Sequence, residues 1–139
     1  MGVYIYVSRR KQRNMIDYTD YIESKARAAH EAVRAFSSAL DEPHFLHTML
    51  RPWDKLPLWL MQLNSDLAAH SLNERVTPVY FHPFWTAEMQ NLGWRGGHMN
   101  ERQKHHPNLV EFYKLPHTEI TKMDIFIYVA RKHLPQETA

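Results

Sequence analysis

Two tryptophans and the basic loop that follows them are the residues with the clearest potential for chemistry. Trp85 and Trp94 precede Arg95, Lys104 and His106 in the second half of the chain. An aromatic face can stack on a base, and Arg or Lys supplies charge-assisted hydrogen bonds to phosphate. These residue types could therefore hold a ligand that carries both a base and phosphates. The alternative is that the tryptophans simply fill the core of a small helical protein, which is where such residues are often found.

The loop itself has two interpretations. Glycines at Gly96 and Gly97 let backbone N–H groups approach an anion closely, but a Gly-Gly pair next to a helix end is also an ordinary turn. His106, which precedes Pro107, is more typical of a hydrogen-bonding residue that fixes a loop than of a catalyst.

The sequence contains no motif typical of a metal site or of a common class of enzyme. Among ten histidines, His44 and His47 have helical spacing, but no Glu lies between them and no Cys or acidic cluster completes a metal site. Gly-x-Ser-x-Gly, P-loop and paired-carboxylate patterns are also absent. We expect no metal, no cofactor and no catalytic residue, with an enzyme acting on a nucleotide-type ligand as one alternative.

Length and composition limit the class of protein. A chain of 139 residues suits one domain, and a formal charge of +2 gives no strong field for holding a long nucleic acid. The absence of cysteine fits a reducing compartment. No stretch resembles a secretion signal or reaches membrane-spanning length, so a cytoplasmic protein without membrane contact is predicted.

Helices must position these residues. Apolar residues recur at three- and four-residue spacing from Asp17 to Leu40, and a second helix is predicted from Pro57 to about Ser71. A third should begin at His82–Pro83 and stop before Gly93. The segment Ile120–Leu134 fits either a strand or a helix.

The first ten residues predict a short strand. Val3, Ile5 and Val7 alternate with Tyr4 and Tyr6. An apolar edge of this kind can pair with another chain, so a protein-interaction or assembly module is a second alternative, and a homo-oligomer, with a dimer favoured, is expected.

Two stretches of the chain echo each other. Residues 52–57 read Pro-Trp-Asp-Lys-Leu-Pro and residues 111–116 read Glu-Phe-Tyr-Lys-Leu-Pro, while His30 and His82 open similar upstream segments. Duplication of a helical unit explains both echoes. We therefore predict one mainly α domain of two pseudo-repeated units, residues 15–72 and 80–134, after an appendage over 1–10.

The same segments resemble the ryanodine-receptor repeat (RyR) domain. The resemblance is carried by His82–Trp85, Trp94–Gly97 and the string His-Pro-Asn-Leu-Val-Glu-Phe-Tyr-Lys-Leu-Pro at 106–116. Upstream, His30–Phe36 and Pro52–Pro57 are similar to small prokaryotic and phage members, so the likeness spans roughly Ile16 to Leu134.

This resemblance implies a helical domain with a pseudo-twofold axis, which favours helix over strand for Ile120–Leu134. It also implies a non-enzymatic binding role, since the receptor domain is associated with a nucleotide, and small members are proposed to recognise nucleotide-derived defence signals. A phage-like protein of this kind could sequester such a signal. The ligand-binding residues expected on this basis are Trp85, Trp94, Arg95, Lys104, His106, Arg34 and His82.

Overall fold

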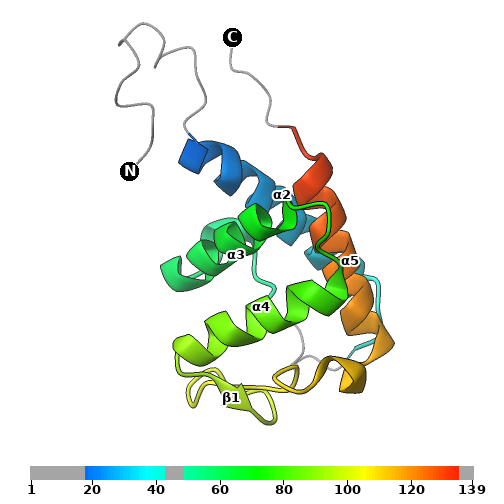
Figure 1. Ribbon diagram of the computed structural model, residues 1–139. Helices are drawn as coiled ribbons and strands as arrows, with labels where there is room; N and C mark the ends of the chain where they lie inside the picture. Colours follow the sequence, from blue (N-terminus) through cyan, green and yellow to red (C-terminus); the bar gives the residue numbers. More distant parts are fainter. Residues whose placement is uncertain (1–17, 43–48, 135–139) are drawn as a thin grey trace, which may run out of the picture.

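The structure, a computed structural model, describes residues 18–42 and 49–134. This part of the chain is mainly helical, as predicted (Figure 1). The predicted strand Val3–Val7 and the candidate metal pair His44 and His47 lie outside the described residues. The principal helices are α2 (Tyr18–Ser38), α3 (Leu58–Ser71), α4 (Pro78–Asn91) and α5 (His117–Lys132). None of the helices in the described segments has the length and apolar character needed to cross a membrane.

Helices α2 and α5 form the main helix pair, although they lie far apart in the sequence (Figure 1). Lys25 of α2 is only 1% exposed, and its Nζ donates to the carbonyls of Ala130, at 2.9 Å, and His133, at 2.6 Å. The last carbonyls of a helix have no partner within the helix and carry partial negative charge. Lys25 therefore caps α5 and joins the two helices.

The apolar core lies where the four helices meet. Phe81 of α4 packs against Phe126 of α5, with ring centroids 5.5 Å apart. Small residues of α2 allow its neighbours to approach closely, since Ala26 and Ala29 are fully buried. The other buried apolar residues of this core include Ile22, Trp53, Leu56, Leu60, Leu63, Leu67, Val76, Met89, Trp94 and Ile127.

Each predicted unit contains a short 3-10 helix at the echoed sequence. The first is η3 (Trp53–Lys55) and the second is η4 (Phe112–Lys114). Both end in an extended leucine, with φ and ψ of −74° and 143° at Leu56 and of −70° and 140° at Leu115. The Lys-Leu-Pro sequence thus builds the same connection twice, because proline after leucine favours extended backbone and then starts the next helix.

A histidine supports each 3-10 helix from the preceding long helix. His30 of α2 lies edge-on to Trp53, at 5.9 Å between ring centroids, and His82 of α4 is tilted against Phe112 at 6.0 Å. The local backbone and these ring contacts repeat between the α2–η3–α3 and α4–η4–α5 units.

The predicted start of the third helix was wrong. Helix α4 begins at Pro78, and Pro83 lies inside it. Proline is suited to the first turn of a helix, so Pro78 and Pro83 were both possible starts. The backbone of Thr77 is extended, and the helix therefore begins at Pro78. Pro83 removes one N–H from the helix on an exposed face, where water can bond the freed carbonyl.

The end of α4 and the nature of the last segment agree with the predictions. Gly93 has φ of 91° directly after the helix, a conformation that suits glycine. The segment that was ambiguous in the sequence forms α5, which buries Phe126, Ile127 and Ala130. Tertiary packing of one helical face therefore decides against a strand.

Candidate functional site

A cavity of about 170 Å³ lies between the two units. Counted from Pro57 and Pro116, which precede α3 and α5, corresponding positions line both sides: Leu60 with Glu119, Asn64 with Met123, and Leu67 with Phe126. The remaining lining residues are His30, Val33, Met49, Leu50, Phe81, His82, Trp85, Met89, Met99, His106, Asn108 and Lys122. The cavity is therefore a product of the packing of one unit on the other.

The size and lining of this cavity suit a single ring system. An apolar protein cavity of about 150 Å³ can hold benzene. Here Trp85 lies edge-on to His106, with ring centroids 5.0 Å apart, and both are half-buried cavity residues. Methionines such as Met99 and Met123 add adaptable apolar surface.

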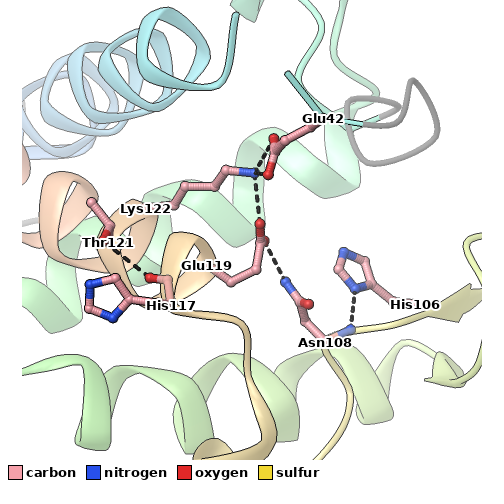
Figure 2. A network of polar contacts seen from close by, with 7 residues as sticks. All are labelled: Glu42, His106, Asn108, His117, Glu119, Thr121 and Lys122. Carbon is pink, nitrogen blue, oxygen red and sulfur yellow. Dashed lines mark hydrogen bonds and ion pairs between the residues drawn. The ribbon is translucent and has the colours of Figure 1, made fainter. Parts of the chain in front are cut away.

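A buried ion network forms one wall of the cavity (Figure 2). Lys122 Nζ donates to Glu42 Oε1 at 2.9 Å, to Glu42 Oε2 at 3.2 Å and to Glu119 Oε2 at 2.8 Å. The other oxygen of Glu119, Oε1, accepts from Asn108 Nδ2 at 2.8 Å. Helix α5 is thereby tied to Glu42 beyond α2 and to the Asn108 loop.

The cation of this wall is already bonded. The Lys122 side chain is 9% exposed, and its three N–H groups are shared among three carboxylate oxygen contacts. Lys122 and Glu119 line the cavity, and Glu42 contacts Lys122 from outside the lining. An anion placed in the cavity would meet the Glu119 carboxylate and an ammonium that is already bonded, in a poorly hydrated setting where an unpaired charge is costly.

His106 is held neutral in a defined orientation. Its Nδ1 accepts the backbone N–H of Asn108 at 3.0 Å, so the ring proton belongs on Nε2 (Figure 2). Burial lowers the pKa of His106 to about 4; the charge of Glu119 opposes this shift, while Lys122 and His82 add to it. His82 Nε2 donates to the carbonyl of Asn108 at 2.8 Å, so both histidines position the same loop.

Stability should depend on pH through His106. An unfolded histidine titrates near about 6.5. Because the folded ring has a pKa of about 4, the neutral ring contributes fully to the free energy of unfolding above about pH 6.5, and this contribution is lost as the pH falls towards about 4. The variant His106→Asn keeps an acceptor for the Asn108 N–H but does not titrate. Between about pH 7 and about pH 4.5 we expect its free energy of unfolding to fall by about 1–3 kcal/mol less than that of the unmodified protein. Urea unfolding at both pH values measures this difference, and an unchanged pH dependence in the variant would contradict it.

His30 contributes a second, related feature. Burial lowers the pKa of His30. The hydrogen bond that its Nε2 donates to the carbonyl of Arg51, at 2.7 Å, raises the pKa and offsets part of this shift. His30 should therefore give the His106→Asn variant a residual loss of stability in acid.

Asn64 is the unusual polar group of the cavity. It lies on α3 between the buried residues Leu60 and Leu67 and is only 8% exposed. Its side-chain amide makes no hydrogen bond with any residue in the described ranges 18–42 and 49–134. Buried amides are nearly always hydrogen-bonded, so an open one on a cavity wall is suited to a ligand.

The structure brings three of the predicted site residues to the cavity. His82, Trp85 and His106 all line it. Trp94 lies behind this lining, 4% exposed, with its ring centroid 5.7 Å from Trp59 and 6.4 Å from His106. Trp94 therefore supports the wall.

The three predicted cations are not among the lining residues. Lys104 Nζ donates to the carbonyl of Leu92 at 2.8 Å and so caps α4. Arg34 donates to the carbonyl of Leu50 at 2.9 Å and pairs with Glu31 at 2.6 Å. Arg95 is exposed.

The glycine loop forms a small parallel ladder between β1 (Arg95–Gly96) and β2 (His105–His106). Its N–H groups are partly used, since Arg95 donates to Lys104 O at 2.8 Å and Gly97 to His106 O at 3.3 Å. A Cβ on Gly96 would lie 2.7 Å from the carbonyl oxygen of Leu109, so glycine at this position lets the backbone of β1 lie close to Leu109. The loop geometry thus has a structural explanation without an anion.

Sequence reasoning missed Asn64, Asn108, Glu119 and Lys122. A signal for Asn64 was present, because it stands in the apolar stripe formed by Leu60, Leu63 and Leu67. The spacing of Glu119 and Lys122 indicates a helical ion pair, but their burial depends on tertiary packing.

Comparisons of the chain with family models, curated proteins and solved structures gave no match in any of the three. The resemblance to the RyR domain stays a prediction from sequence motifs.

Proposed function

We propose that this protein is a non-enzymatic binding module that holds the ring of a nucleotide-derived small molecule in the cavity between its two units. The observation that carries the proposal is a ring-sized cavity with Trp85 and His106 on one side and the unpartnered amide of Asn64 in its lining. Ligand cavities commonly combine an apolar lining with a few polar groups that fix orientation.

The charges around the cavity favour the ring, rather than the phosphates, as its occupant. The Lys122 ammonium at the cavity wall is already bonded to Glu42 and Glu119. Arg95 and Lys104 belong to the loop that leads to His106, so phosphates extending along this loop would meet positive charge. The sequence resemblance to proteins proposed to recognise nucleotide-derived defence signals supports the same ligand class, and sequestration of such a signal is a role consistent with it.

Titration calorimetry with nucleosides, nucleotides and cyclic oligonucleotides tests this function. Trp85→Ala should weaken binding by about tenfold or more, because loss of an aromatic stacking partner typically costs that much. Tyr113→Ala is the matched control, since Tyr113 is an exposed aromatic residue that does not line the cavity. Circular dichroism confirms that both variants are folded. No heat of binding with any ligand at millimolar concentration would refute the proposal.

A further inference from the structure

The geometry points to Asn64 as the residue that determines specificity in this cavity. We infer that it selects an uncharged heterocycle whose edge carries a hydrogen-bond donor next to an acceptor, such as an amino group beside a ring nitrogen. This inference rests on the proposed function and names the part of the ligand that the cavity reads.

Most polar groups around the cavity are already occupied. Lys122 donates to Glu42 and Glu119, and Asn108 Nδ2 donates to Glu119. His82 donates from Nε2 to the carbonyl of Asn108. His30 is occupied in the same way, donating from its Nε2 to the carbonyl of Arg51. A ligand entering the cavity would therefore find few open groups.

The Asn64 amide is open as both a donor and an acceptor, and the Nε2–H of His106 is an open donor. The other open atoms of the lining, Oδ1 of Asn108 and Nδ1 of His30 and His82, can only accept, because the histidine protons are on Nε2. The amide has no partner in the part of the chain that the structure describes, although Asn64 is 8% exposed. His106 uses Nδ1 as an acceptor for Asn108, which leaves Nε2–H as a donor. One amide offers a donor and an acceptor side by side, which is the geometry that pairs with an amino group adjacent to a ring nitrogen.

The repeat places this amide on one wall only. The position that corresponds to Asn64 in the second unit is Met123, which also lines the cavity. A ring between the units therefore meets a hydrogen-bonding group on the α3 side and a thioether on the α5 side. This asymmetry gives the ring a preferred orientation despite the repeated backbone.

The pairing of the lining cation disfavours the anionic part of a ligand in the cavity. Lys122 lines the cavity but is already bonded to Glu119 and Glu42, so a phosphate there would find no free cation among the described lining residues and would be buried at a cost. A neutral ring has no such cost. Adenine and adenosine monophosphate should therefore bind within a few-fold of each other, and inorganic phosphate should not displace adenine.

The decisive experiment compares adenine with indole, a similar flat ring system that has no amino group and no acceptor ring nitrogen. In calorimetry, Asn64→Leu should bind adenine about ten- to a hundredfold more weakly than the unmodified protein does. Its affinity for indole should stay the same or increase. Asn64→Ala provides a second variant with less side-chain bulk, and thermal unfolding confirms that each variant is folded.

Gln62→Leu is the matched control, because Gln62 is an exposed amide on the same helix and bonds Asp66. It should leave the affinities for both rings unchanged. Equal effects of Asn64→Leu on adenine and indole, or no effect on either, would overturn the role of Asn64. If the unmodified protein bound neither ring, the proposed function itself would fail.

Discussion

Replacement of Lys122 by methionine should lower the free energy of unfolding by about 3–5 kcal/mol at neutral pH. Lys122 is the ammonium between Glu42 and Glu119, and the three side chains are 9%, 10% and 12% exposed (Figure 2). Methionine fills similar space but removes the ammonium that both buried carboxylates contact. Chemical denaturation at constant pH measures the effect.

Two further variants separate charge from packing at this site. Lys104→Met is the matched control, because Lys104 bonds only a carbonyl in the described structure and is exposed, so its loss should cost less than about 1 kcal/mol. Adding Glu42→Gln and Glu119→Gln to Lys122→Met should recover part of the stability, since the two carboxylate charges that faced the ammonium are then removed with it. A loss for Lys122→Met as small as that of the control would show that the network behaves as a surface ion pair.

Truncation of Phe126 to alanine should have an effect of similar size, a loss of about 3–5 kcal/mol. Phe126 packs against Phe81 in the core and also lines the cavity. Removing its ring deletes buried apolar surface and leaves a void that joins the existing cavity. Thermal and urea unfolding provide the measurement.

Tyr128→Ala is the control on the same helix. Tyr128 is 64% exposed, so its loss should change stability by no more than about 0.5 kcal/mol. Comparable losses for the two variants would mean that α5 is stabilised mainly by its own helical propensity rather than by the face that it buries.

The helices were largely predictable because their apolar residues follow a period near 3.6 along α2 and α3. The start of α4 was not, since Pro78 and Pro83 both fit a helix start and only the backbone before Pro78 distinguishes them. The last helix, α5, was ambiguous because β-branched and aromatic residues suit either structure. Its packing on α2 decided the matter.

The candidate site was predictable only in part. Aromatic and histidine positions in the repeated motifs pointed to Trp85, His82 and His106, which line the cavity. Two of the three expected cations, Arg34 and Lys104, instead bond backbone carbonyls, and Arg95 is exposed. No local pattern shows such pairings.

The buried ion network joins residues that are distant in the sequence. Lys122 and Glu42 are 80 positions apart, so only the tertiary structure brings them together. Asn64 could have been suspected from its apolar neighbours, but its lack of a partner is a property of the folded state.

The cap that Lys25 places on α5 has a consequence for the folding rate. It joins Lys25 to Ala130, 105 positions away. The entropy lost in closing so long a loop is recovered only when α5 docks on α2, and proteins rich in such distant contacts fold more slowly than bundles of neighbouring helices. We therefore expect the approach of α2 and α5 to be part of the rate-limiting step of folding.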